Sequence, residues 1–147
     1  MKRITKIEID NYKAYVTKEV FELPAGQNLL LYGENGSGKS SLFRALQYFM
    51  ESSVNGVGHF DNNYYSGRDD GKIEITFCDY DFVSNSINKA TEQIFTATES
   101  PATTTTSNPF LKTAYRISGF LDYSTLLRVY LNNNSSLNFP GPKRPWQ

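Results

Sequence analysis

Cysteine, histidine and tryptophan each occur only once in this chain of 147 residues. The single cysteine, Cys78, excludes an intramolecular disulfide and any metal site built from several cysteines. The 15 basic and 15 acidic residues balance, so the charge gives no reason to expect a polybasic nucleic-acid binder. No run of about 18 apolar residues occurs, which argues against a membrane span, and no apolar signal segment follows the basic start. We therefore expect a cytoplasmic protein with no membrane partner.

Apolar residues, by contrast, are sufficient for a core. Hydrophobic residues make up 39% of the chain and aromatic residues 14%. A length of 147 residues suits one domain.

Several segments alternate apolar and polar residues with the period of two that half-buried strands show. We expect such strands over residues 2–10, 16–23, 72–80, 92–98 and 114–119. The run LLLY at residues 29–32 has no polar interruption and favours a strand covered on both faces. Apolar residues at helical spacing predict helices over residues 39–51 and 122–132.

Two other stretches are poor in apolar periodicity. Residues 98–109 (TESPATTTTSNP) predict an exposed, mobile loop. Residues 133–147 show no period and contain several prolines, so they indicate an irregular tail. These boundaries assign the domain itself to residues 1–132.

A glycine-rich segment, residues 33–40 (GENGSGKS), matches the phosphate-loop pattern G-x-x-x-x-G-K-[ST]. A loop that wraps a phosphate closely needs backbone angles and a close approach that glycine permits. Its backbone N–H groups then point inward as an anion-binding nest. The candidate nucleotide-binding residues in and next to this loop are Gly33, Asn35, Gly36, Ser37, Gly38, Lys39, Ser40 and Ser41.

Two side chains of the segment carry specific chemistry. Lys39 would bring a full positive charge to the β- and γ-phosphates, and it is the candidate catalytic residue. The hydroxyl of Ser40 is placed to coordinate Mg²⁺, and the helix expected to begin near Lys39 adds its positive dipole end. For Ser41, a role in the first helical turn is the alternative to ligand binding. The flanking strand and helix make a chance glycine-rich turn the weaker interpretation.

At this point the sequence resembles a known family, the ABC-type ATPase heads of the RecF/SMC group. These include DNA-repair ATPases and ATP-binding proteins of antiphage systems. The GENGSGKS form of the loop is similar, and residues 11–15 (NYKAY) are similar to the family's Asn-Phe-[Arg/Lys]-small-[aromatic/His] stretch. Residues 41–46 (SLFRAL) are similar to Ser-Leu-Leu-x-Ala-Leu. The resemblance covers residues 2–51.

The resemblance implies an α/β fold, that of a P-loop NTPase N-terminal lobe with a mixed sheet, an antiparallel β subdomain and few helices. It implies ATP and Mg²⁺ as cofactors, with Lys13 and Asn35 near the phosphates. A solvated strand-end lysine and a turn asparagine are the alternatives for these two residues. The implied partners are a C-terminal ATPase lobe or a second head, as in a homodimer, and DNA through the assembled complex. The implied process is DNA repair or phage defence.

The sequence also departs from the family in ways that bear on hydrolysis. Such ATPases use an apolar strand ending in Asp-Glu to hold Mg²⁺ and orient the attacking water. The nearest stretch ends in Asp79-Tyr80, where Tyr80 replaces the glutamate. No Leu-Ser-Gly-Gly-type signature is present, and Asp122 stands where a glutamine would be expected, although a helix N-cap is its alternative role. We therefore expect ATP binding, with hydrolysis dependent on another lobe or head.

Two alternatives remain open from the sequence. A small standalone P-loop kinase or NTPase would need a mainly parallel sheet with more helices after the loop than the pattern indicates. A truncated, non-catalytic remnant or a regulatory lobe would fit the abrupt change of composition near the end of the chain.

Overall fold

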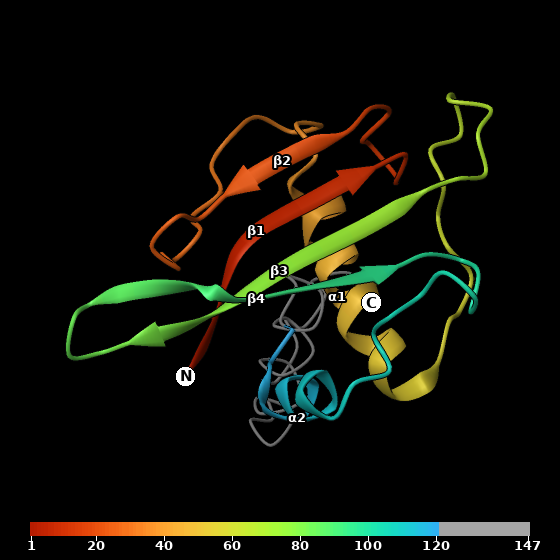
Figure 1. Ribbon diagram of the computed structural model, residues 1–147. Coiled ribbons are helices and arrows are strands. Elements are labelled where there is room, and N and C mark those ends of the chain that lie inside the picture. The colour runs from red at the N-terminus through yellow and green to blue at the C-terminus, as the bar shows by residue number, and fades with distance from the viewer. Residues whose placement is uncertain (121–147) are drawn as a thin grey trace, which may run out of the picture.

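Four strands form one antiparallel sheet that is backed by a long helix (Figure 1). The computed structural model describes residues 1–120. Its elements are, in chain order, β1 (Lys2–Asp10), β2 (Glu19–Glu22), α1 (Lys39–Asn55), β3 (Lys72–Asp81), β4 (Ser86–Ala97) and α2 (Pro109–Ile117). The expected α/β class, with an antiparallel sheet and few helices, is confirmed, but no parallel strand pair occurs within residues 1–120.

The strand order is β2-β1-β3-β4, and the register places apolar residues in rows across the sheet. Ile7 of β1 lies opposite Phe21 on one side and Ile75 on the other, and Ile75 lies opposite Phe95. Because side chains alternate between the two faces of a strand, each such row lies on one face. This face meets α1, which runs behind the sheet in Figure 1.

The core lies between this face and the two helices. In α1, Leu42, Ala45 and Phe49 recur at helical spacing and therefore share one face of the helix. This face packs against the sheet, and the three residues are almost completely buried. Helix α2 lies beside α1, and it adds Leu111 to the core and stacks Phe110 edge-on against Phe77 at 5.2 Å. The sheet contributes Ile7, Ile9, Ile73, Ile75, Phe77, Phe95 and Ala97.

The strand expected at residues 29–32 is not formed. The segment has no strand partner within residues 1–120, and its apolar side chains are exposed, with Leu30 92% and Tyr32 100% accessible. A fully apolar run becomes a strand only when neighbouring strands pair with it and layers cover both faces. The prediction of a strand here was wrong for the described chain because those neighbours are absent from it.

The strand expected at residues 114–119 was also wrong, because α2 occupies most of this stretch. The side chain of Asn108 accepts a hydrogen bond from the Phe110 N–H at 2.8 Å, and Pro109 occupies the first turn. Both are helix-start signals. The apparent alternation of Tyr115 and Ile117 was misleading, since Ile117 is 82% exposed.

The remaining segments follow the expectations more closely. Helix α1 starts at the expected residue and extends four residues past the expected end. Residues 82–85 turn between β3 and β4, which project as a hairpin beyond the sheet (Figure 1). Strand β4 begins six residues before the strand expected at residues 92–98. Threonine side chains hydrogen-bond within the loop after β4, and the mobility expected for that loop stays a prediction. The helix at 122–132 and the tail at 133–147 lie outside the described residues.

Neither helix in residues 1–120 has both the length and the apolar content that crossing a bilayer would require.

The outer face of the sheet carries an ionic cluster around Glu8, which is only 8% exposed. Its carboxylate contacts Lys18 Nζ at 2.5 Å and Lys6 Nζ at 3.5 Å. The hydrogen bond from Lys18 is the main reason that the pKa of Glu8 falls from its ordinary value to about 2. Glu74 lies opposite Glu8 in the register and pairs with Lys72 at 3.2 Å.

The Glu8 cluster predicts a specific acid sensitivity. Because the carboxyl has a lower pKa in the folded chain than in the unfolded chain, its contribution to stability is complete above pH ~4.5 and is lost as pH falls toward ~2. We expect Glu8→Gln to reduce the difference between the urea midpoints at pH 7 and pH 3. The control is Glu22→Gln, since Glu22 is exposed and has no ion pair within residues 1–120. An identical pH dependence in the wild type and Glu8→Gln would contradict this assignment.

Candidate functional site

The phosphate-loop segment, residues 33–40, leads directly into the first turn of α1. The backbone is left-handed at Gly36 (φ 87°) and Gly38 (φ 86°), a conformation that would strain any other residue. Gly38 is the N-cap of α1 and has no side chain to occupy the helix N-terminus, and the first turn has no acidic residue. Within residues 1–120, neither the N-cap nor the first turn of α1 therefore places a carboxylate on its first N–H groups, which suits an anion site.

The ammonium of Lys39 lies within this loop. Lys39 Nζ donates to the carbonyl oxygens of Gly33 at 2.7 Å and Glu34 at 2.5 Å, and to Ser37 Oγ at 3.1 Å. The contacts hold a full positive charge among the residues whose N–H groups form the loop. An anionic group bound there would be within reach of the charge through a small side-chain movement.

The other candidate residues of the loop differ in accessibility. Asn35, Ser37 and Ser40 are exposed, and the Ser40 hydroxyl makes no hydrogen bond within residues 1–120. Such a hydroxyl fits the hard oxygen ligand that Mg²⁺ prefers. Ser41 is half-buried, and its Oγ accepts the Ala14 N–H at 3.3 Å, so the structure gives Ser41 a contact with the preceding turn.

Lys13 is directed to a different partner. Its Nζ lies 2.5 Å from Asp61 Oδ2, and its backbone N–H donates to the Asp61 carbonyl at 2.9 Å. The residue also has a left-handed backbone, with φ of 47°. In the described chain the charge of Lys13 is neutralised by Asp61, and its role near a phosphate stays a prediction.

No acidic residue with a catalytic arrangement accompanies the loop in residues 1–120. Asp79 pairs with Lys2 at 3.4 Å, and these two residues lie opposite each other at the start of β1. The turn that contacts the loop follows the other end of β1, roughly 25 Å away along the strand. No group of three or more His, Cys, Asp or Glu side chains in this part of the chain is arranged to hold a metal ion. Asp122 lies outside the described residues.

A tight turn at residues 11–15 joins β1 to this site. Tyr12 and Tyr15 exchange two backbone hydrogen bonds, of 2.9 and 2.8 Å, and so close the turn. Besides the Ala14–Ser41 contact, the Tyr15 hydroxyl donates to the Gly38 carbonyl at 3.1 Å. This stretch carried only a family resemblance in the sequence, and no local pattern in it indicates the contact of Tyr15 with the loop.

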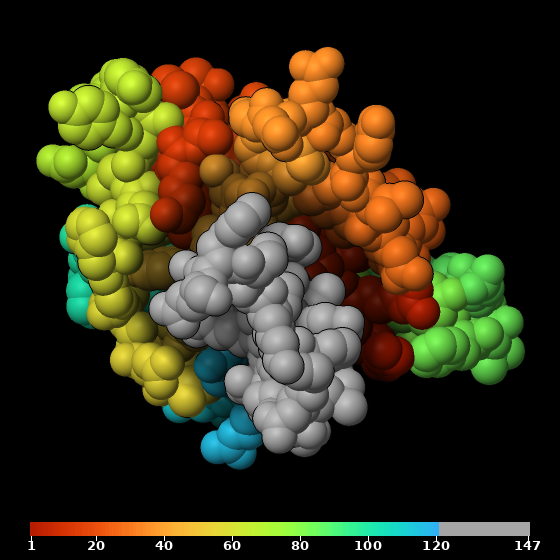
Figure 2. All heavy atoms as spheres, turned by 180° about the vertical axis from the view of Figure 1, so that it is seen from behind, coloured from red at the N-terminus to blue at the C-terminus, as the bar shows by residue number. Residues whose placement is uncertain are grey.

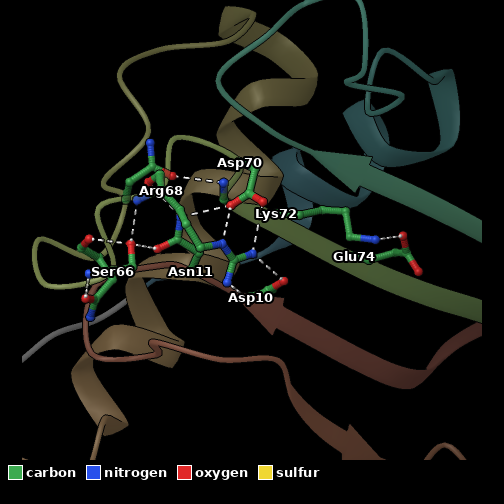
Figure 3. A network of polar contacts seen from close by, with 10 residues as sticks. Asp10, Asn11, Ser66, Arg68, Asp70, Lys72 and Glu74 are labelled. Atoms are coloured by element: carbon green, nitrogen blue, oxygen red, sulfur yellow. Dashed lines mark hydrogen bonds and ion pairs between the residues drawn. The ribbon is translucent and has the colours of Figure 1, made fainter.

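The buried amide of Asn11 fixes the start of this turn (Figure 3). Asn11 is fully buried and has a φ of 49°, which asparagine tolerates better than most residues. Its Nδ2 donates to the Arg68 carbonyl at 2.8 Å and to Asp70 Oδ1 at 3.2 Å, and its Oδ1 accepts from Ser66 Oγ. The loop at residues 60–71 is thereby fastened to the end of β1. An asparagine directly after a strand was the sequence signal available for this role.

Charged groups extend the network outward. Arg68 contacts Asp10 at 3.1 Å and Asp70 at 2.8 Å, and its hydrogen bond lowers the pKa of the Asp70 carboxyl. On the inner side, Gly71 has no room for a side chain, because an added Cβ would lie 2.7 Å from the Asn11 carbonyl. The loop and the turn are therefore packed as one unit.

Comparison with known families gives one match. A family model described as an AAA domain matches residues 6–134, which include the turn, the phosphate loop and all six elements except the first residues of β1. Comparisons with curated proteins and with solved structures gave no significant match.

Replacing Asn11 should loosen the unit. We expect Asn11→Ala to lower the free energy of unfolding by about 2–4 kcal/mol, because it removes three side-chain hydrogen bonds, leaves buried polar groups unpaired and strains the left-handed backbone. Urea unfolding would measure the loss. The matched control is Asn55→Ala, since Asn55 is exposed at the end of α1. Equal stability of Asn11→Ala and Asn55→Ala would show that the network is not stabilising.

Proposed function

The chain belongs to the AAA domain family, and on this basis we propose that it binds ATP with Mg²⁺ through residues 33–40. The observation that carries the proposal is the junction of the loop with α1. Left-handed glycines lead into a helix whose N-cap and first turn carry no acidic residue, and the Lys39 ammonium lies in the same loop. These are the features that phosphate binding demands.

Each residue of the loop has a defined task in this proposal. The N–H groups of the loop and of the first turn of α1 bind the phosphate oxygens, and Lys39 leaves its carbonyl partners to pair with the β- and γ-phosphates. Ser40 would hold Mg²⁺, and the bound ion supplies positive charge to the phosphate oxygens. Asn35 and Lys13 are secondary candidates, and Lys13 would first have to separate from Asp61.

ATP binding by the purified chain tests this proposal directly. We expect Lys39→Ala to weaken the binding of Mg·ATP by about 10–100-fold, since a charge-assisted contact contributes about 1.5–3 kcal/mol. Isothermal titration calorimetry would measure the affinity. Lys89→Ala is the matched control, because Lys89 is exposed on β4 and has no ion pair within residues 1–120. Equal binding by the wild type and Lys39→Ala would refute the phosphate-loop assignment.

Hydrolysis, in our proposal, requires residues that this part of the chain does not supply. Asp79, the nearest acid of the expected type, pairs with Lys2 far from the loop. We therefore propose that a C-terminal ATPase lobe or a second head contributes the acid that orients water, as the resemblance to RecF/SMC-type heads implies. On the same resemblance, ATP-driven closure would serve DNA repair or phage defence, with DNA bound by the assembled complex.

The exposed run at residues 29–32 supports this proposal. The segment precedes the phosphate loop, and it belongs to the orange region on the surface of the molecule in Figure 2. Leu29 and Leu31 are 38% and 39% exposed, and Leu30 and Tyr32 are far more so. A contiguous apolar strip of this kind fits burial against another lobe. The antiparallel sheet, in turn, does not favour the small-kinase alternative, which needs parallel βαβ units.

Turnover separates this proposal from a self-sufficient enzyme. We expect the chain alone to release phosphate from ATP no faster than Lys39→Ala, because in our proposal the loop positions the phosphates and another lobe or head supplies the acid that orients water. A phosphate-release assay over a range of protein concentrations would measure the rate. Turnover that depends on Lys39 in the chain alone would contradict the need for another lobe or head.

A further inference from the structure

Tyr15 contacts the phosphate loop from outside the glycine-rich motif. Its hydroxyl donates to the Gly38 carbonyl at 3.1 Å. The same carbonyl accepts the Leu42 N–H at 2.9 Å, which is the first hydrogen bond of α1. Tyr15 is therefore a second donor at the carbonyl where the loop becomes a helix.

The Tyr15 ring also covers the outside of Gly38. A Cβ placed on Gly38 would lie 3.2–3.4 Å from the hydroxyl and ring atoms of Tyr15. Gly38 has a left-handed backbone, with φ of 86°. Tyr15 thus contacts Gly38 in two ways. Its hydroxyl donates to the carbonyl oxygen, and its hydroxyl and ring atoms lie close to the position that a side chain on Gly38 would occupy.

Because the Gly38–Lys39 peptide is planar, this contact also affects the side of the loop that would face a phosphate. The peptide between Gly38 and Lys39 is planar, and in a trans peptide the N–H points opposite to the C=O. A hydroxyl that fixes the direction of the Gly38 carbonyl therefore also fixes the direction of the Lys39 N–H. That N–H is the first of α1, and it lies on the side of the peptide away from Tyr15.

Tyr15 is itself held in place. Its ring packs edge-on against Phe21 of β2 at 6.2 Å, and its backbone closes the turn with Tyr12. Burial raises the pKa of the Tyr15 phenol further above its ordinary value, and the protonated hydroxyl is a donor at neutral pH. The turn is fastened by Asn11 and by Asn63, whose Nδ2 donates to the Lys13 carbonyl.

We propose that Tyr15 is a positioning residue for the phosphate loop, whose hydroxyl orients the Gly38–Lys39 peptide so that the Lys39 N–H faces a bound phosphate. The inference rests on the proposed binding of ATP at this loop. It goes further by assigning a role to a residue of β1's turn, outside the glycine-rich motif. Tyr15 does not touch the nucleotide in this role, and it acts only through the orientation of one peptide.

Tyr15→Phe tests the role, because it removes the hydroxyl and keeps the ring against Phe21. We expect the dissociation constant of Mg·ATP to rise about three- to tenfold, the effect of one lost hydrogen bond. Binding of AMP, measured by displacement of a fluorescent nucleotide, should be unchanged, because AMP lacks the β- and γ-phosphates that the loop binds. In the NMR spectrum, the shift of the Lys39 amide proton on addition of Mg·ATP should be smaller in Tyr15→Phe.

Two further tyrosines provide controls. Tyr64 is 90% exposed, and its hydroxyl makes no hydrogen bond within residues 1–120, so Tyr64→Phe should leave ATP affinity unchanged. The Tyr48 hydroxyl donates to the Gly58 and Thr98 carbonyls, away from the loop. Tyr48→Phe should lower the unfolding midpoint without changing the ratio of ATP to AMP affinity. All affinities are compared well below the lowest unfolding midpoint.

The outcomes separate the inference from the function on which it rests. Tyr15→Phe with wild-type ATP affinity, or with an equal loss for ATP and AMP, overturns the positioning role while leaving ATP binding intact. The positioning role is also overturned if Mg·ATP shifts the Lys39 amide proton equally in Tyr15→Phe and in the wild type. If the wild type itself fails to bind Mg·ATP, then the proposed function is wrong and the role of Tyr15 falls with it.

Discussion

The arrangement of the candidate site depends on one buried polar side chain, the amide of Asn11. It closes the end of β1, fastens the loop at residues 60–71 and sets the left-handed start of the next turn. A buried amide is costly unless its donors and acceptor are paired, and here all of them are. The turn then brings Ala14 and Tyr15 to the first turn of α1. The conformation of the phosphate loop is thus supported from a strand that precedes it by more than twenty residues.

Binding and turnover are separate questions in this molecule. The groups proposed to bind phosphate lie in the loop and at the start of α1, and most of them come from eight consecutive residues. We propose that the groups that would activate water come from another lobe or head, because Asp79 pairs with Lys2 at the far end of β1. The exposed apolar run at residues 29–32 agrees with this proposal.

Local sequence patterns correctly predicted the elements whose packing partners lie within residues 1–120. Alternation identified β1 and β3, and helical spacing identified α1, because each buries one face against the other. The same reasoning failed at residues 29–32, where an apolar run lacks the neighbours that would make it a strand. It failed again at α2, where the Asn108 cap and Pro109 outweighed a weak alternation. Both errors came from inferring pairing partners from one segment alone.

The sequence by itself determined the phosphate loop, because the glycines, the lysine and the serine act through backbone angles and charges within a few residues. It also determined the apolar faces of β1, β3 and α1, which are periodic along the chain. Only the tertiary structure decided that Lys13 pairs with Asp61, that Asn11 holds the loop at residues 60–71, and that Tyr15 reaches Gly38. These contacts join residues far apart in sequence, and no local pattern encodes which partner a side chain meets after the sheet and α1 have packed.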